Sequence, residues 1–489
     1  MKQKFLLLVL AMLYVALTYS CKESSPADVE DQSNDPPPFS AVEMPSQLAN
    51  GDPFPTDSNT INGWLTSKSV VDGVETNTNV IRHAWGLWQA LTEMTDQTFE
   101  GRTLRRYETW YTPQDVMTAM NEYTSLDNLN RNDGALQFRN KFKFGHDSDL
   151  RPVAGDISGK VKYSPGMAEK ALEGDFFNTE YLKSLMVPGK INSVRFDPED
   201  VMLKPIYRVL TDMNKVEGTE DTYYFHIWGG KQDGGKQDSL FSKKINVTTN
   251  TQNPAIDNSS TYSIDEFIHH RMSDDEAYTY NHSSKEGQEF VGDTARAGDP
   301  VILIGMHVSS RETQRWTWQS FYWTEEPDNP IFPSSAIIAA ERKSLNKALT
   351  SPTDNYAVSI GYSMMSPALP YEGPPVDIMN ADVNPVYALN PYIEGTFDTS
   401  VFPAQDSFFT GGYAKQLYKT NIDGITSNCM SCHSQAYYTG SGFNEHTFLA
   451  DQYVNRNAPW FEGFVQLDFA WSLYPGFEPQ PSEVNKPSN

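Results

Sequence analysis

The sequence predicts an α+β fold, with a β-rich body, flanking helices and a C-terminal segment made mainly of helices and loops. The first observation is a set of runs rich in Val, Ile, Tyr, Trp and Phe and bounded by Gly, Pro or Asp, which is typical of strands. These runs cover residues 201–210, 222–228, 300–308 and 316–323. The second observation is that helix-like segments lie at the ends of the body and do not alternate with the runs. A parallel sheet built from βαβ units is therefore not expected.

The N-terminus has the pattern of a bacterial export signal. Lys2 and Lys4 begin it, and residues 5–17 form an uninterrupted apolar or aromatic run. A short polar stretch then leads to Cys21. We therefore expect residues 1–20 to be a signal peptide and Cys21 to be the lipidated first residue of a lipoprotein. The alternative is an ordinary secretory peptide that happens to carry this cysteine.

Composition divides the rest of the chain into three parts. Residues 21–54 are rich in Ser, Asp, Glu and Pro, and we expect the lipidated cysteine and a disordered tether there. Residues 55–400 are expected to form the β-rich body, with a helical N-terminal part. Residues 401–489 form the C-terminal segment. No second apolar run approaches the length that a membrane span needs.

Three local patterns predict where helices begin within the body. Apolar residues recur at helical spacing in residues 80–95. Thr112 followed by Pro113 has the residue types of an N-cap and a first helical position. Ser263 with Glu266 forms a capping-box pattern before a pair of apolar residues.

Composition also excludes some classes of function. The formal net charge is −25 at pH 7, whereas a nucleic-acid-binding protein needs a basic surface. The sequence has no nucleophile elbow of a serine hydrolase, no zinc-protease motif and no glycine-rich nucleotide loop. A hydrolase or a nucleotide-dependent enzyme is therefore without support.

The cysteines carry the most specific signal. The chain has only three, and Cys429 and Cys432 precede His433 in a C-x-x-C-H motif. Two thiols at this spacing can form thioethers with the vinyl groups of one haem, and the following histidine can then bind the iron. A dithiol redox pair does not need that histidine, and no cysteines are left for the second half of a zinc site. The sequence therefore predicts one covalent haem c in residues 401–489, with His433 as the proximal iron ligand.

The chain resembles uncharacterised exported bacterial proteins of the cytochrome c family with a single C-terminal CxxCH haem site. Residues 427–433 carry the specific part of the resemblance, and residues 107–110, 305–308 and 316–318 are softer matches. The resemblance implies haem binding but no assigned activity. The chain differs from small soluble cytochromes, whose motif lies near the N-terminus and whose distal methionine lies downstream, because no methionine follows His433.

The distal iron ligand is expected to be His307 or His446. His307 ends an apolar strand close to a group of tryptophans, and His446 is the only histidine after the motif. Strand alternation would place Met306 and His307 on opposite faces. His269 and His270 are expected on a helix, where adjacent side chains diverge by about 100° and cannot face one iron together. If no residue binds on the distal side, the iron is open.

Two functions follow from these expectations. The first is electron transfer in the periplasm or at the membrane surface, with a redox partner protein that is basic because this chain is acidic. The lipid would anchor the protein to the outer or cytoplasmic membrane, facing the periplasm or the cell surface. The alternative is an oxidoreductase with an open iron, peroxidase- or oxygenase-like, or a small-ligand sensor, which would account for so large a body. Four arginines are candidates, by charge alone, for binding the haem propionates: Arg105, Arg106, Arg311 and Arg315.

Overall fold

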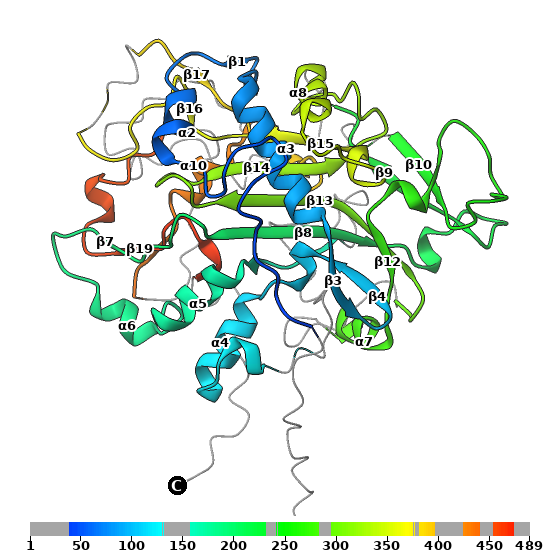
Figure 1. The fold of residues 1–489 in the computed structure, drawn as a ribbon, viewed down its shortest axis with the longest axis horizontal. Helices are drawn as coiled ribbons and strands as arrows, with labels where there is room; N and C mark the ends of the chain where they lie inside the picture. The colour runs from blue at the N-terminus through cyan, green and yellow to red at the C-terminus, as the bar shows by residue number, and fades with distance from the viewer. Residues whose placement is uncertain are drawn as a thin grey trace, which may run out of the picture.

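An antiparallel sheet lies at the centre of the molecule, with helices and smaller sheets around it (Figure 1). The computed structural model describes residues 39–129, 131, 157–230, 241, 243–282, 295–374, 376, 381–396, 424–440 and 453–473. Helices and strands occur along the whole of these ranges, so the predicted α+β class is confirmed.

The central sheet has seven strands, and each of its pairings is antiparallel. The main path runs β15-β14-β13-β8-β5, with β12 beside β13 and β6 beside β8. The bounds are β5 (Ile157–Gly159), β6 (Lys162–Tyr163), β8 (Val201–Val209), β12 (His269–Arg271), β13 (Pro300–Ser310), β14 (Thr317–Trp323) and β15 (Tyr356–Ile360). Three of the four predicted strands are therefore the adjacent strands β8, β13 and β14.

Smaller sheets surround this one. The fourth predicted strand is β9, which belongs to a three-stranded sheet in the order β11-β10-β9. A second three-stranded sheet, β18-β19-β7, joins the C-terminal segment to the body. The bounds are β1 (Val70–Val71), β2 (Val74–Glu75), β3 (Met94–Phe99), β4 (Arg102–Arg105), β7 (Asn192–Ser193), β9 (Thr222–Ile227), β10 (Lys243–Thr248), β11 (Thr261–Ser263), β16 (Met365–Ser366), β17 (Asn384–Pro385), β18 (Tyr437–Tyr438) and β19 (Val465–Gln466).

Two of the helices, α3 and α4, match the predicted helix positions. The bounds are α2 (Ser58–Trp64), α3 (Thr78–Thr92), α4 (Pro113–Glu122), α5 (Pro165–Glu173), α6 (Thr179–Ser184), α7 (Asp274–His282), α8 (Ala336–Glu341) and α10 (Cys429–His433). Thr112 caps α4, with Pro113 as its first residue, and the Ser263 capping box opens a short 3₁₀ turn. The predicted helix over residues 80–95 is α3, which ends at Thr92.

Helix α3 covers one face of the central sheet. Trp85 and Trp88 are fully buried there, and Trp88 stacks on Phe321 of β14 with ring centroids 4.5 Å apart. Burial of an aromatic side chain of this kind contributes about 1.5–3 kcal/mol. These three rings belong to the larger of the apolar cores.

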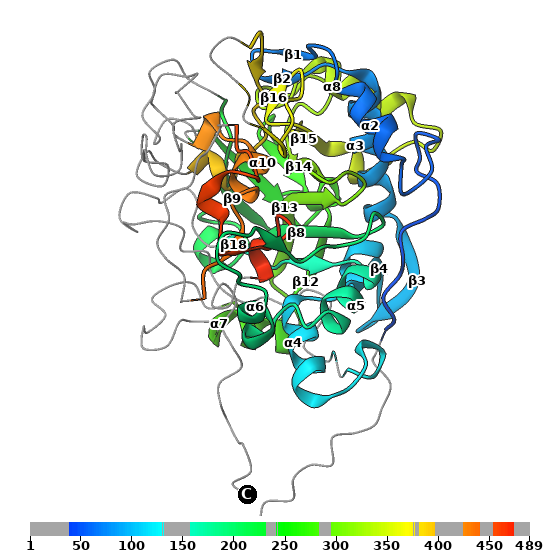
Figure 2. The same ribbon diagram turned by 90° about the vertical axis from the view of Figure 1, so that its left-hand side faces the viewer.

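The opposite face of the sheet carries the C-terminal segment. Trp318 lies three residues before Phe321 in β14 and therefore points the other way. It belongs to a second apolar core together with Met430 of α10 and Phe469. Figure 2 shows the strands between α3 on one side and α10 on the other. The sheet thus separates the face that α3 covers from the face that carries the C-x-x-C-H motif.

Two expectations need correction. His269 and His270 lie in strand β12, because this segment pairs with β13, His269 opposite Ile302, and that pairing outweighs the local helix-like pattern. The tether expected over residues 21–54 is not found in residues 48–54, because Leu48 and Phe54 are buried in the first core. Residues 1–38, with the signal peptide and Cys21, lie outside the described residues.

The expected absence of a second membrane span can be compared with the helices. Among the residues that the structure describes, no helix combines the length and the apolar character needed to cross a bilayer.

Candidate functional site

The C-x-x-C-H motif folds as the short helix α10, and Asn428, the residue before the motif, fixes this helix in place. The Asn428 side chain accepts a hydrogen bond from the Ser431 amide at 3.1 Å and so caps the helix. Its amide nitrogen donates to the Val386 carbonyl at 2.6 Å and to the Ser363 carbonyl at 3.2 Å. One side chain therefore joins the motif helix to two segments that are distant in sequence.

A close backbone approach at Gly361 allows this arrangement. Gly361 directly follows β15, and its amide donates to the Trp318 carbonyl. A Cβ atom at Gly361 would lie 2.4 Å from the Ala388 Cβ and 3.3 Å from the Asn428 side-chain nitrogen. Ala388 in turn accepts the Cys429 amide at 3.1 Å. Only a residue without a side chain lets the motif lie this close to the end of the sheet.

Both thiols of the motif are reduced and partly exposed. Burial raises the pKa of the Cys432 thiol to about 12, and the nearby carboxylate of Glu394 acts in the same direction. The same two causes raise the pKa of Cys429 well above its usual value. At neutral pH the site therefore presents two protonated thiols one helical turn apart.

The His433 imidazole is held in one orientation. Its Nδ1 is 2.8 Å from the Phe469 carbonyl oxygen, and its ring lies against Trp318 with centroids 4.4 Å apart. Because a carbonyl only accepts, Nδ1 carries the proton and Nε2 keeps its lone pair. Burial lowers the pKa of His433 to about 4, so the ring is neutral at pH 7. A metal-binding histidine typically has this tautomer, with its other ring nitrogen donating to a carbonyl oxygen.

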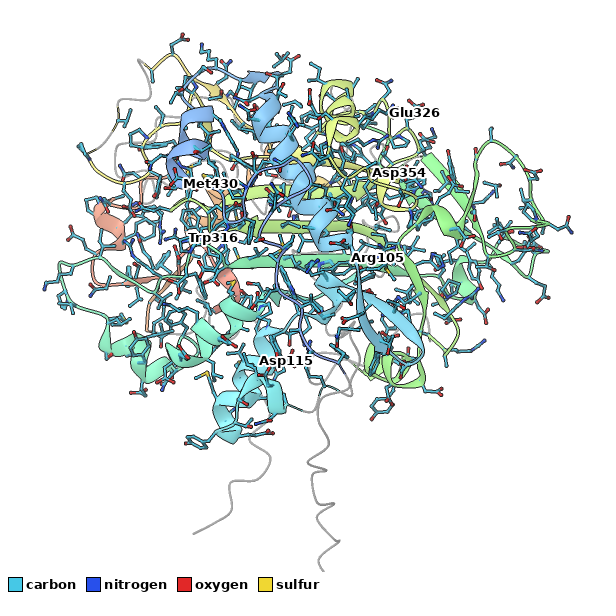
Figure 3. All side chains as sticks on the ribbon, in the orientation of Figure 1. Arg105, Asp115, Trp316, Glu326, Asp354 and Met430 are labelled. Atoms are coloured by element: carbon cyan, nitrogen blue, oxygen red, sulfur yellow. The ribbon has the colours of Figure 1, made fainter. Side chains whose placement is uncertain are left out.

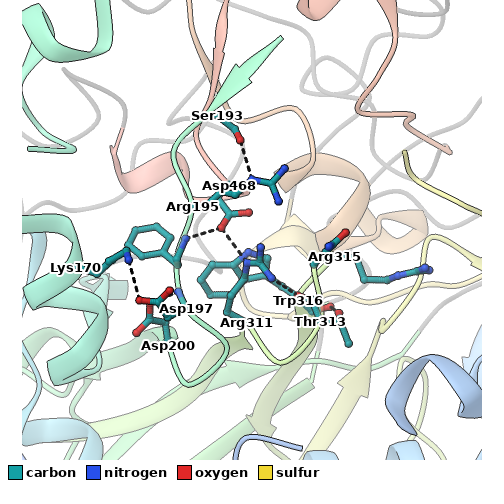
Figure 4. A network of polar contacts seen from close by, with 12 residues as sticks. Lys170, Ser193, Arg195, Asp197, Asp200, Arg311, Thr313, Arg315, Trp316 and Asp468 are labelled. Carbon is teal, nitrogen blue, oxygen red and sulfur yellow. Dashed lines mark hydrogen bonds and ion pairs between the residues drawn. The ribbon is translucent and has the colours of Figure 1, made fainter. Parts of the chain in front are cut away.

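A buried ion pair supports the carbonyl that holds His433. Asp468 and Phe469 have φ angles of 45° and 68°, in the left-handed region that such residues seldom adopt. The Asp468 carboxylate accepts from Arg311 Nε at 2.9 Å and from the Phe196 amide at 2.9 Å (Figure 4). Arg456 Nη1 lies 3.7 Å from its other oxygen. These contacts stabilise a turn whose shape presents the Phe469 carbonyl to the imidazole.

A row of polar side chains crosses the sheet on the same face. His307 of β13 pairs with Lys204 of β8 and with Ser320 of β14, and Ser320 pairs with Ser359 of β15. Residues paired across antiparallel strands project to one side. His307 is also the diagonal neighbour of Trp318, so the predicted distal candidate and the packing partner of His433 lie next to each other on the sheet.

Glu394 joins His307 to the motif. Its Oε1 lies 3.3 Å from His307 Nε2, and its other oxygen accepts the Asn390 amide at 2.6 Å. Burial alone would raise the pKa of Glu394, but the His307 imidazole beside it lowers that pKa below its usual value. Glu394 and His307 both act electrostatically on His433. The structure thus brings together Cys429, Cys432, His433 and His307, and adds Glu394, which sequence reasoning missed.

Two other buried histidines lie away from the motif. His83 is on the opposite face of the sheet, where Nε2 is 3.1 Å from Glu312 and Nδ1 is 2.7 Å from the Tyr362 hydroxyl. His270 is buried against Glu276 at 3.2 Å. His446 and Cys21 lie outside the described residues.

The donor set of the site can be compared with the group that the motif predicts. Two reduced thiols and a neutral imidazole with a free Nε2 match the attachment and proximal ligation of a haem c. In the part of the chain that the structure describes, no three His, Cys, Asp or Glu side chains are grouped so as to hold a metal ion by themselves.

Comparisons with known proteins add no relative. No family model, curated protein or solved structure matches this chain.

Proposed function

We propose that the chain is an exported protein of the cytochrome c family that binds one haem c and transfers electrons. Cys429 and Cys432 would form the thioethers, and His433 would bind the iron. The observation that carries the proposal is the His433 imidazole, whose Nδ1 donates to the Phe469 carbonyl at 2.8 Å, while Nε2 has no hydrogen-bond partner among the described residues and both cysteines of the motif are reduced. When bound, haem c supplies an iron that accepts and releases one electron.

The side chains around the motif suit an electron-transfer site because they fix it. Asn428 prevents α10 from rotating, and the Phe469 carbonyl prevents the imidazole from turning. Trp318 packs against the ring and limits its movement on that side. A site that moves little between two charge states has a small reorganisation cost, which favours transfer over chemistry.

The distal ligand decides between electron transfer and catalysis. His307 is the first choice, because it shares a sheet face with Trp318 and acts electrostatically on His433. His446 is the second choice. Ligation by either histidine would give a bis-histidine iron suited to electron transfer.

One observation favours a second candidate function. His307 Nε2 already has a partner, Glu394 Oε1 at 3.3 Å. If this pair persists, the iron is open, and the protein is a single-haem oxidoreductase, peroxidase- or oxygenase-like, or a sensor of a small ligand. His307 and Glu394 would then hold a proton beside the bound molecule.

Absorption spectra with and without carbon monoxide separate the two candidates. We expect a low-spin wild type that does not bind carbon monoxide readily, and a high-spin His307→Ala or His446→Ala variant, because removal of a distal ligand opens the iron. His269→Ala is the control, since its side chain lies on the surface strand β12 with Asp265 at 3.9 Å. A high-spin wild type that binds carbon monoxide at once would favour the open-iron function.

The proposed partner follows from charge. The chain has a formal net charge of −25, which would steer a basic redox protein towards it and make the association rate sensitive to salt. Its proposed location is the outer or cytoplasmic membrane, facing the periplasm or the cell surface, with Cys21 as the lipid anchor.

Replacing Cys21 should release the protein from the membrane. Each buried methylene of an acyl chain contributes about 0.8 kcal/mol to membrane binding, so two or three chains hold a protein firmly. We expect Cys21→Ser to be soluble or unprocessed on fractionation, whereas a Ser20→Ala variant should stay with the membrane. A processed Cys21→Ser protein that is still retained would contradict the lipid anchor.

A further inference from the structure

Three arginines gather behind His433, around the rings of Phe469 and Tyr371. Arg311 follows β13 and forms the 2.9 Å pair with Asp468 described above. Arg456 and Arg315 lie on the same side, each with its guanidinium over an aromatic ring. Arg456 is 4.4 Å from the Phe469 centroid, and Arg315 is 4.9 Å from the Tyr371 centroid. The two rings are neighbours, with centroids 6.4 Å apart.

Arg456 is buried without enough partners for its donors. It is only 3% exposed, and its Nε and Nη2 have no hydrogen-bond partner among the described residues. Within the described ranges, its one ion-pair contact is the long one to Asp468, at 3.7 Å. A guanidinium has five N–H donors, and leaving them buried without acceptors is costly. Arg456 therefore has buried N–H donors to which a bound anion could supply acceptors.

Arg315 repeats the pattern beside it. Among the described residues, its Nε is buried without a hydrogen-bond partner, and its Nη1 makes one long contact of 3.5 Å with the Leu369 carbonyl. Burial lowers its pKa, and no carboxylate among the described residues acts to raise it. Burial also lowers the pKa of Arg456, with Asp468 and Glu372 acting in the opposite direction. Positive charge is therefore in excess in this buried region.

We propose that Arg456 and Arg315 form an anion site that binds carboxylate groups. A carboxylate can accept two parallel hydrogen bonds from one guanidinium, which matches the free donors of these side chains. It would also neutralise the buried excess of charge, which is otherwise unfavourable. The two aromatic rings hold the guanidinium planes in place before the anion arrives.

The carboxylate can come from two sources. One source is the pair of haem propionates. Phe469 contacts both groups involved, because its ring packs against the Arg456 guanidinium and its carbonyl accepts a hydrogen bond from His433. This source rests on the proposed function. The other is a free carboxylate taken up from solution, which does not depend on haem.

The sequence had suggested Arg105 and Arg106 equally, on charge alone. Arg105 donates to the Thr92 carbonyl at 2.6 Å, and Arg106 pairs with Glu93 at 3.0 Å. Figure 3 shows Arg105 far from Trp316 and Met430, which mark the motif side of the sheet. These two arginines are therefore excluded from the site.

The test compares Arg456→Gln and Arg315→Gln with the wild-type protein as it is exported. Arg195→Gln is the matched control, because Arg195 is an exposed arginine of the same region whose Nε lies 3.3 Å from Ser193 (Figure 4). The first readout is the melting temperature as acetate replaces chloride at constant ionic strength. The second is the propionate bending band in the resonance Raman spectrum of the haem-loaded protein.

The outcomes distinguish a haem propionate site, a site for a free carboxylate, and no anion site. A propionate band that shifts in both variants but not in the control, with a wild-type melting temperature insensitive to acetate, assigns the site to the haem. An unchanged band with a wild-type melting temperature that rises with acetate, and a rise lost in both variants, assigns it to a free carboxylate. Unchanged bands together with no response to acetate in the wild type overturn the proposal.

Two further points keep the test decisive. If Arg456→Gln does not fold, Arg315→Gln, whose side chain is only partly buried, gives the answer alone. If the protein carries no haem, the proposed function fails, but the acetate measurement still tests the anion site separately.

Discussion

Replacing Asp468 with alanine should lower the free energy of unfolding by about 3–5 kcal/mol, because removal of one partner from a buried ion pair leaves the other charge uncompensated. Asp468 is 2% exposed and is the carboxylate paired with both Arg311 and Arg456. It also accepts the Phe196 amide, which would lose its partner. Urea denaturation of the purified variant measures the change.

The contrast with a surface pair makes this prediction specific. Asp197 pairs with Lys170 at 2.9 Å, and both side chains are substantially exposed (Figure 4). Asp197→Ala should therefore cost only about 0–1 kcal/mol. Asp468→Asn, which keeps an oxygen acceptor for the amide, should fall between the two. Equal stabilities for the Asp468→Ala and Asp197→Ala proteins would contradict the role given to the buried cluster.

Replacing His433 with alanine should change the iron more than any other single substitution. The thioethers would still hold the haem through Cys429 and Cys432, but the proximal ligand would be gone. We expect the absorption spectrum to lose the features of a histidine-ligated haem, and the reduction potential to shift. His226→Ala is the control, because its Nδ1 also lies near a backbone carbonyl, that of Phe241 at 3.0 Å, in the sheet remote from the motif.

Two results would contradict this second prediction. Spectra of His433→Ala identical to wild type would show that another residue is the proximal ligand. A spectrum changed equally by His226→Ala would show that the effect comes from general destabilisation and not from lost ligation.

Much of the fold could be predicted because its signals are local. The Thr112–Pro113 helix start and the Ser263 capping box depend on contacts within one turn, and both are found in the structure. The strands β8, β13 and β14 are rich in β-branched and aromatic residues, which is typical of strands. The pair His269–His270 was assigned wrongly because its conformation is set by pairing with β13, a contact distant in sequence.

Only those residues of the site that are neighbours in the sequence could be predicted from it. Cys429, Cys432 and His433 stand together in the chain, so their spacing is visible in the sequence. Glu394 and Asp468 have no local pattern that distinguishes them from the many surface carboxylates of an acidic protein. Their place beside His307 and behind His433 arises from the antiparallel register and from the packing of the C-terminal segment on the sheet.

The burial of the arginines behind His433 could not be predicted from the sequence either. Arg456 was not a candidate in the sequence, because a charged residue in a polar stretch is usually exposed. Its burial depends on Phe469 and Tyr371, which approach it only in the folded chain. Arg315 was a candidate only by charge, as were Arg105 and Arg106, which have satisfied partners elsewhere.

The central claim is that Cys429 and Cys432 bind haem covalently, and the intact mass of the exported protein after denaturation tests it most directly. The account predicts a wild-type mass that exceeds the polypeptide by one haem, and haem that acid acetone does not extract. The added mass should be largely lost in Cys432→Ala and kept in the neighbouring Met430→Leu variant. A wild-type protein with the bare polypeptide mass, or haem that extracts freely, would contradict the claim.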